Sequence, residues 1–326
     1  MSFLVRRVAF YIVTAWAALT INFALPRLMP GTPVQAALDK LQGTATPGTV
    51  RALEAQFGLD TKSSLLHQYG HYWSQLFHGD LGVSTSEYPA KVTTIIGHAL
   101  PWTIALVGIS SVIAFTLGTV LGVLVAWRRG TRIDALVPVT TFLSAIPYFW
   151  LALILVTVFG VTLHWLPISQ GVAQGVSTGF TWSFISSAIG HGFLPGITIV
   201  IAAVAGWMLG MRNMTVATLS EDYVMVAQAK GLSTRRVVTT YAARNAILPN
   251  LAGFALQLGL VVGGSLLTEI IFSYPGVGNL LLNAVQSNDY PLMQGLFLVI
   301  TLVVLLANFV ADLLYVVLDP RTRQEA

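Results

Sequence analysis

The sequence ALPWTIALVGISSVIAFTLGTVLGVLVAW, at residues 99–127, contains no charged side chain and consists mainly of aliphatic and small residues. A helix rises about 1.5 Å per residue, so about 20 apolar residues cross the hydrocarbon core of a bilayer. This stretch is therefore predicted to be a transmembrane helix. The whole chain has the same character, because 55% of its 326 residues are hydrophobic and 9% are charged, against roughly 25% charged residues in soluble proteins. A secreted enzyme, a soluble nucleic-acid binder and a disordered scaffold are poor fits.

Similar charge-free stretches recur along the chain. The stretch between Asp134 and Arg212 is long enough for two spans, with a break rich in Gly, Ser and Gln at 169–191. The expected fold class is an all-α membrane protein. Its six transmembrane helices are expected at 8–29, 99–127, 136–161, 193–212, 250–272 and 291–317.

The distribution of Lys and Arg predicts how these helices are oriented. Most of the 17 Lys and Arg residues fall on one side of the membrane if the N-terminus is inside, and the two later outer loops have none. Cytoplasmic loops carry an excess of such residues, so both termini are expected to be cytoplasmic. A competing interpretation reads Arg6-Arg7 and Ala15-Trp16-Ala17 as a cleavable signal peptide. The apolar run continues to Leu25, which favours a retained first helix.

The predicted spans divide the chain into parts. We expect an N-terminal transmembrane helix at 1–29, an outer-side loop at 30–98, a five-helix transmembrane core at 99–317 and a cytoplasmic tail at 318–326. In the outer loop, 50–57 and 65–77 are predicted to be short amphipathic helices. The second has a face rich in Trp and Tyr, which suits either the membrane interface or a small lid packed on the transmembrane helices.

The cytoplasmic loop at 212–249 is predicted to contain two short capped helices. Ser220 can cap a helix whose first turn carries Glu221 and Asp222, and this helix is expected to stop at Gly231. Ser233 can cap a second helix that continues to Leu248-Pro249. Two helices joined by a tight turn form a rigid protrusion that suits docking into a groove of a soluble partner, although a solvated connecting loop fits the same pattern.

Catalytic and metal-binding interpretations have weak support. The chain has no cysteine and no Gly-x-x-x-x-Gly-Lys-Ser/Thr loop to hold ATP phosphates. Gly175-Val176-Ser177-Thr178-Gly179 matches the nucleophile-elbow pattern of hydrolases but lies in an outer loop without nearby acidic residues. His67, His71 and His78 could form a metal face, yet no carboxylate completes the set. No catalytic, cofactor or metal site is expected on this chain.

The interiors of the predicted spans bear on the mechanism of transport and on packing. An ion-coupled secondary transporter usually has ionisable residues near the midplane, whereas the centres of these spans have no Asp, Glu, Lys or Arg. A passive gated pathway is therefore favoured over the ion-coupled alternative. Helix-packing faces are expected at three Gly-x-x-x-Gly pairs, namely Gly118/Gly122, Gly206/Gly210 and Gly259/Gly263.

A dozen short motifs occur in order along almost the whole chain. They include Leu28-Met29-Pro30-Gly31, Gly79-Asp80-Leu81-Gly82, Ile146-Pro147-Tyr148-Phe149, Ala227-Gln228-Ala229-Lys230-Gly231, Arg244-Asn245-Ala246, Tyr274-Pro275-Gly276-Val277-Gly278 and Asp289-Tyr290-Pro291. In this order and spacing they resemble the inner-membrane permeases of ABC importers of the dipeptide/oligopeptide/nickel class, specifically the first (B-type) of their two permease types. The resemblance implies the type I importer permease fold.

The resemblance also implies partners and a role for the 212–249 loop. The partners would be a second, C-type permease subunit, two ATP-binding cassette subunits that hold ATP and Mg²⁺, an extracytoplasmic substrate-binding protein and the lipid bilayer of a bacterial or archaeal plasma membrane, with no nucleic acid. The loop would contain the coupling helix that seats in the ATPase subunit. Its expected coupling residues are Glu221, Asp222, Tyr223, Ala227, Gln228, Ala229, Lys230 and Gly231. Two departures from the wider pattern, Met225-Val226-Ala227 and Gln228, leave the decisive contact residue open.

An outer gate and pathway are expected where helix five ends, because a proline and two glycines interrupt it there. Its residues are expected to be Gly263, Ser265, Thr268, Glu269, Phe272, Tyr274, Pro275, Gly276 and Gly278. A simple helix terminator is the alternative. The resemblance implies import of di- or oligopeptides, with short oligosaccharides as the nearest alternative and metal or opine-like solutes behind them.

Overall fold

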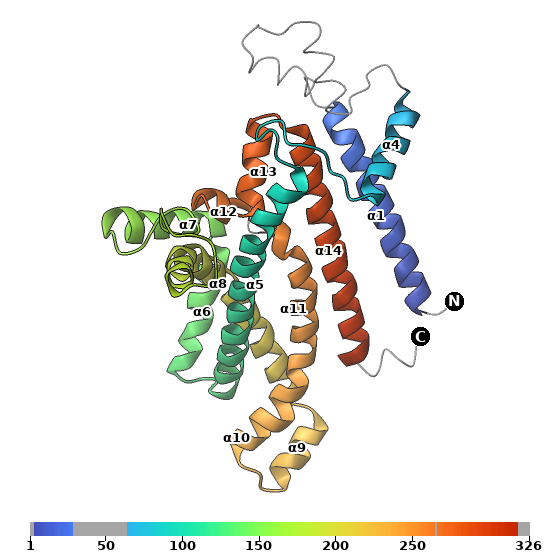
Figure 1. Cartoon of the computed structure of the whole chain (residues 1–326). Coiled ribbons are helices and arrows are strands. Elements are labelled where there is room, and N and C mark those ends of the chain that lie inside the picture. Colours follow the sequence, from blue (N-terminus) through green and yellow to red (C-terminus); the bar gives the residue numbers. More distant parts are fainter. Residues whose placement is uncertain (1–2, 29–63, 265, 319–326) are drawn as a thin grey trace, which may run out of the picture. The chain divides into compact units, whose positions relative to one another are not determined.

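The computed structural model describes residues 3–28, 64–264 and 266–318, and these fold into helices joined by turns (Figure 1). The described residues contain no β-strand, and their one isolated β-bridge pairs Val83 with Lys91. The helical fold class expected from the sequence is confirmed. The predicted helix at 50–57 and the predicted tail lie outside the described residues, apart from Leu318.

The chain forms two compact units. The first unit comprises residues up to Trp102 together with Pro275–Leu305, and the second comprises Thr103–Tyr274 with the residues from Leu306 onward. The helices of the first unit are α1 (Phe3–Leu28), α4 (Leu65–Phe77), the start of α5 (Val92–Trp127), α13 (Val277–Gln286) and most of α14 (Tyr290–Leu318).

The second unit contains the rest of α5 and the helices that follow it. They are η1 (Arg132–Ala135), α6 (Leu136–Ala145), α7 (Tyr148–Leu155), the π-helix η2 (Val156–Thr162), α8 (Trp182–Leu219), α9 (Asp222–Ala229), α10 (Thr234–Arg236), the π-helix η3 (Val237–Ala243), α11 (Arg244–Gly264) and α12 (Leu266–Ile271).

Four helices of the described residues are long and apolar enough to cross a bilayer. They are Val5–Leu25 within α1, α5, α8 and Tyr290–Val310 within α14. A fifth candidate is the pair Arg132–Ala145 and Tyr148–Thr162. The six spans expected from the sequence are therefore not confirmed, since the predicted span at 250–272 corresponds to α11 and α12, which are not among these candidates.

The predicted single helix at 136–161 is wrong, because the chain bends by 94° between α6 and the helix that begins at Tyr148. Ile146 and Pro147 are both extended at the bend, with ψ of 123° and 130°. Proline disfavours the helical conformation of the residue before it and donates no backbone hydrogen bond. Ile146-Pro147 therefore ends one helix and starts the next.

Close packing of α5 on α8 confirms one of the three predicted glycine pairs. A Cβ on Gly118 would lie 2.5 Å from the Cβ of Trp207, and a Cβ on Gly122 would lie 2.6 Å from the carbonyl oxygen of Met208. Both distances are shorter than side chains tolerate. Gly206 by contrast faces open space, so the second pair is not a packing face as a whole. The third predicted pair, Gly259 and Gly263, lies outside the residues whose packing the structure describes.

Candidate functional site

The segment predicted to couple with an ATPase forms a helical hairpin at one end of the second unit, where α9 packs on η3, the continuation of α10 (Figure 1). Its first helix begins one residue later than the sequence suggested. Glu221 is the N-cap of α9, while Ser220 ends α8 and donates its hydroxyl to the carbonyl oxygen of Ala217 at 2.7 Å. The prediction that Ser220 caps α9 is wrong, because α8 continues without a break to Leu219.

The turn after α9 has the geometry expected from its glycine. Gly231 has φ of 74°, the left-handed region that residues with a Cβ rarely adopt. Its N–H donates to the carbonyl oxygen of Gln228 at 2.9 Å, and the N–H of Leu232 donates to that of Ala227 at 3.4 Å. These two bonds define a Schellman turn. Ser233 follows as the predicted N-cap of α10, but the helix it starts runs through Pro249 to Gly264.

One face of α9 is buried in the chain's own core. Val224 and Ala227 lie one helical turn apart and pack with Val237 of η3, and all three are almost fully buried. Leu219, Leu232 and Tyr241 surround them. Ala227 was expected to contact a partner, but its side chain is 3% exposed. It therefore positions α9 and contributes little to the outer surface.

The other face of α9 is exposed and partly apolar. The exposed fractions are 41% for Tyr223, 50% for Met225 and 53% for Val226. Of the expected coupling residues, those exposed beside them are Glu221, Asp222, Gln228, Ala229, Lys230 and Gly231. The hydroxyl of Tyr223 accepts a hydrogen bond from Asn245 Nδ2 at 2.9 Å, which ties α9 to the start of α11. Asn245 was present in a family motif, but nothing in its sequence context indicated this contact.

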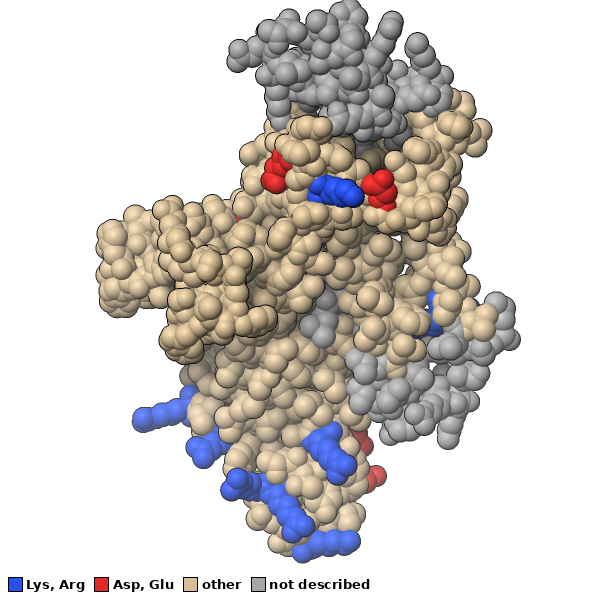
Figure 2. Space-filling model, in the orientation of Figure 1, with Lys and Arg blue, Asp and Glu red and all other residues tan. Residues whose placement is uncertain are grey.

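Positive charge gathers at the same end of the second unit, around α9 and α10 (Figure 2). An ion pair lies near it, with Arg212 Nη2 of α8 at 3.6 Å from Asp134 Oδ1. The other oxygen of Asp134 accepts the N–H of Gly130 at 2.9 Å. The pair joins the segment after α5 to the end of α8, so these two segments lie at the same level of the second unit.

The predicted gate residues of the second unit lie around the end of α12. Thr268, Glu269, Phe272 and Tyr274 are each less than 5% exposed. Burial, and then the charge of Glu269, raises the pKa of the Tyr274 phenol to about 12. The Tyr274 hydroxyl lies 3.7 Å from where Gly192 of α8 would carry a Cβ. These four side chains are therefore packed inside the unit.

The turn that ends α12 differs from the prediction. The residue with a left-handed backbone is Ser273, with φ of 44°. The N–H of Ser273 donates to Ile270 and that of Tyr274 to Glu269, at 3.1 and 2.8 Å, which makes a second Schellman turn. Gly276 is the extended N-cap of α13, with φ of −95°, and Gly278 lies inside α13. Both glycines therefore have backbone conformations that other residues can also adopt.

Two further residues were predicted for the gate. Ser265 lies outside the described residues, and Gly263 belongs to α11.

Comparison with known proteins identifies the family. Residues 118–324 match the family described as binding-protein-dependent transport system inner membrane component. The chain belongs to this family. It is 35% identical to the di/tripeptide transport system permease protein DppB of Pseudomonas aeruginosa, over 100% of this chain and 99% of that protein. Membership confirms the family expected from the sequence motifs.

Two other relatives also match along nearly their whole length. The chain is 33% identical to the dipeptide transport system permease protein DppB of Escherichia coli, over 100% of this chain and 99% of that protein. It is 31% identical to the oligopeptide transport system permease protein AppB of Bacillus subtilis, over 98% of each.

A cluster of hydrogen bonds in the first unit was missed by the sequence analysis. Asp289 is fully buried. It accepts the N–H and the hydroxyl of Ser86 at 2.9 and 2.7 Å, the hydroxyl of Ser84, and the N–H of Leu292 at 3.1 Å, which caps α14. Burial alone would raise the pKa of this carboxyl, but the hydrogen bonds from Ser84 and Ser86 outweigh it and hold the pKa below its ordinary value of 3.8.

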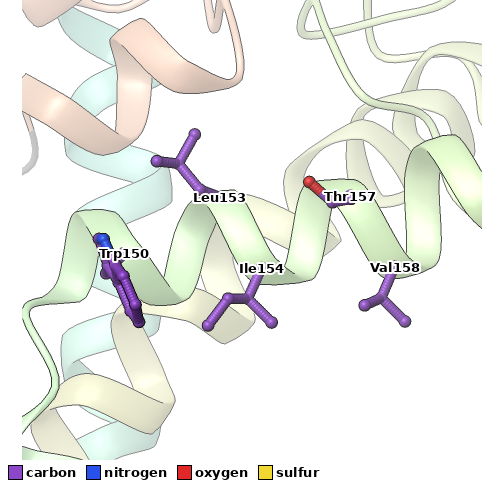
Figure 3. A pocket seen from close by; sticks show the side chains of 5 residues that line it. All are labelled: Trp150, Leu153, Ile154, Thr157 and Val158. Atoms are coloured by element: carbon purple, nitrogen blue, oxygen red, sulfur yellow. The ribbon is translucent and has the colours of Figure 1, made fainter.

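A shallow groove on α7 and η2 has no chemistry for a polar solute. It measures about 300 Å³ and is lined by Trp150, Leu153, Ile154, Thr157 and Val158 (Figure 3). Four of these side chains are apolar and at least 40% exposed. In a membrane component, such a face suits acyl chains or another subunit.

The catalytic and metal patterns remain without structural support. The Gly175–Gly179 stretch lies in turns and bends that follow no strand, although Thr181 caps the helix after it. His67 and His71 lie on one face of α4, and His78 Nδ1 donates to the carbonyl oxygen of Ser74 at 2.7 Å. Among the residues that the structure describes, no three metal-ligating side chains come together.

Proposed function

We propose that this chain is a transmembrane permease subunit of an ATP-driven, binding-protein-dependent importer, and that it forms half of a pathway for di- or oligopeptides. The family supports the permease role, and the names of the full-length relatives support the substrate class. The other half of the pathway would come from a C-type permease. ATP and Mg²⁺ would be held by two separate ATP-binding cassette subunits, and an extracytoplasmic binding protein would deliver the solute.

The exposed face of α9 carries the proposal of coupling. A short helix that is fixed by a buried core and a Schellman turn can move as a rigid body when a partner displaces it. Its exposed side chains, Tyr223, Met225 and Val226, offer apolar contacts to a cleft in that partner. Aromatic and Met side chains are enriched at the centres of protein interfaces. Acidic side chains at one end of α9 and Lys230 at the other would surround this apolar centre.

The proposed topology has six spans with both termini cytoplasmic. Two observations support it. The Asp134–Arg212 ion pair requires an even number of crossings between these residues, which α6 with α7 and then α8 would supply. The positive charge around α9 and α10 suits the cytoplasmic side. The fifth crossing would be made by α11 and α12, whose buried end we propose as the outer gate.

The coupling proposal is tested by the double variant Met225→Asp and Val226→Asp in the reconstituted complex. Charges on this face should reduce ATPase stimulation by the loaded binding protein by about tenfold or more, since placing a charge at an apolar interface position costs on the order of 1–2 kcal/mol. Thr240→Asp, on an exposed part of η3, is the matched control. Full stimulation in the double variant would exclude the α9 face from coupling.

The transport proposal is tested in proteoliposomes that contain all subunits. Uptake of a labelled dipeptide should require ATP in the compartment that the ATPase subunits face. It should persist when no ion gradient is present. Unlabelled di- and tripeptides should compete, whereas short oligosaccharides should not. Uptake driven by an ion gradient without ATP would identify a secondary transporter instead.

A further inference from the structure

Helix α4 of the first unit is held against α1 by one of its faces (Figure 1). The Tyr69 hydroxyl and Thr20 Oγ1 are hydrogen-bonded at 2.7 Å, and Asn22 Nδ2 donates to the Tyr72 hydroxyl at 3.3 Å. The ring of Phe23 packs on both tyrosines, with centroids 5.1 and 5.5 Å away. Two hydrogen bonds and two ring contacts within four residues of α1 fix the position of α4 along the length of α1.

A second face of α4 is apolar and exposed. Leu66, Gly70, Trp73 and Phe77 follow the spacing i, i+4, i+7 and i+11, which places them along one side of a helix. Leu66 is 83% exposed and Phe77 is 82% exposed, and the rings of Trp73 and Phe77 lie 5.9 Å apart. This arrangement leaves large apolar side chains without a covering group among the described residues.

The third face of α4 is polar and uncharged. His67, His71 and Ser74 are exposed on it. The whole helix, LLHQYGHYWSQLF, contains no Asp, Glu, Lys or Arg. A helix facing water on two sides would ordinarily carry charges, whereas a helix between hydrocarbon and water needs one apolar and one polar side.

The level at which α4 is attached favours lipid as the covering group. The candidate span of α1 runs from Val5 to Leu25, and the attachment points at 20–23 lie in its last two turns. Twenty-one residues at about 1.5 Å each match a hydrocarbon core of about 30 Å. Helix α4 is therefore attached close to the boundary of the core, beside Ile21 and Leu25 of α1, which are themselves exposed.

We propose that α4 lies in the membrane interface of the leaflet opposite the N-terminus. Its Leu66–Gly70–Trp73–Phe77 stripe contacts acyl chains, and its His67–His71–Ser74 face contacts headgroups and water. Trp and Tyr prefer this zone because each has an apolar body and a polar edge. The placement depends on the span of α1 and not on the transported solute, so its failure would leave the proposed function standing.

The chain has no cysteine, so single labels can be placed on each face. Leu66→Cys and Phe77→Cys report on the apolar stripe, and His67→Cys and His71→Cys are matched controls on the polar face. Each variant is assembled with partner subunits whose cysteines are replaced by serine, reconstituted in phospholipid nanodiscs and coupled to a nitroxide. Collision rates are then measured with oxygen, which concentrates in hydrocarbon, and with a water-soluble nickel chelate.

The ratio of oxygen to nickel-chelate collisions should be at least about threefold higher at 66 and 77 than at 67 and 71, as for a helix lying in the interface. Equal ratios at all four positions would overturn the proposal. Labels at 66 and 77 that neither reagent reaches would also overturn it, because a protein partner would then cover the stripe. As a second readout, a bimane on the same cysteines should be quenched by lipids that carry a nitroxide on the acyl chain, and quenching at 71 equal to that at 66 would contradict the placement.

Discussion

Asp289 joins two parts of the first unit that are far apart in sequence, because Ser84 lies 205 residues before it. One carboxylate satisfies the hydroxyl groups and N–H of the 84–86 turn and also caps α14. A buried carboxylate with several donors is expensive to replace, since each donor left without an acceptor costs about 1–3 kcal/mol. The contact therefore fixes the segment before α5 to the start of α14.

Replacing this carboxylate is expected to destabilise the protein in a pH-dependent way. Asp289→Asn keeps the size but loses the charge and one acceptor, so the free energy of unfolding at pH 7 should fall by about 1–3 kcal/mol. Because the folded-state pKa of Asp289 lies below its ordinary value of 3.8, its stabilisation is complete above that value and is lost as the pH falls through the folded-state pKa. Thermal unfolding is measured in nanodiscs between pH 7 and pH 3. The unfolding temperatures of the unchanged protein and of Asp289→Asn should converge as the pH falls.

The matched control is Glu87→Gln, which removes one exposed carboxylate from the same segment. It should leave the unfolding temperature unchanged at pH 7. A similar loss in both variants would mean that net charge, and not the hydrogen bonds of Asp289, determines the effect.

At the scale of elements, four of the described helices end in the same Schellman turn, and three residue types occupy its left-handed position. The left-handed residues are Gly79 after α4, Gly231 after α9, Ser273 after α12 and Asn288 after α13. Glycine adopts this conformation without cost and asparagine tolerates it, whereas serine pays roughly 1–2 kcal/mol for its Cβ. The turn at the proposed gate is thus the most strained of the four.

Relief of this strain is expected from Ser273→Gly, which should raise the free energy of unfolding by about 1 kcal/mol. Ser273→Val should lower it, since a β-branched residue fits the left-handed region least well. Ser287→Gly is the control, because Ser287 has φ of −89° and should gain nothing. Thermal unfolding of the three variants gives the order of their stabilities. Equal effects of Ser273→Gly and Ser287→Gly would show that the left-handed backbone at Ser273 is not the cause.

Packing of α5 on α8 is expected to depend on Gly118 and Gly122. Alanine at either position would place a Cβ within 2.6 Å of atoms of α8, and such overpacking costs typically about 1–3 kcal/mol. Gly118→Ala and Gly122→Ala should therefore lower the unfolding temperature of the purified chain. Gly206→Ala, which meets open space on α8, should be neutral or stabilising. A neutral result at both 118 and 122 would show that the helices can separate without loss.

At the scale of the whole molecule, the sequence predicts what depends on local composition. Four predicted spans correspond to long apolar helices, and Gly231 marks its turn because glycine is the usual residue there. The bend at Ile146-Pro147 could have been inferred from the proline, but the long apolar run on both sides concealed it. Ser273 and Asp289 were not predicted correctly, since a left-handed serine and a contact across 205 residues leave no local pattern.

The number of crossings is the property of the whole chain on which the proposed mechanism depends. The proposed six spans would place the α9 hairpin on the cytoplasmic side and the α13–α14 turn on the outer side, because α11 and α12 would cross the membrane between them. If α11 and α12 do not cross the membrane, the α9 hairpin and the α13–α14 turn would face the same compartment. The proposed outer gate would then lie on the cytoplasmic side.

Four single-cysteine variants decide between these topologies in intact cells. Arg129→Cys and Thr234→Cys should be protected from a membrane-impermeant maleimide, whereas Thr178→Cys and Ser287→Cys should react, since all four positions are exposed or partly exposed and the chain has no other cysteine. Lysed cells supply the control, in which all four should react. Labelling at 178 but not at 287 would show that α11 and α12 turn back within the membrane. Labelling at 129 and 234 but not at 178 would show the opposite orientation, with the positive end of the second unit facing outward.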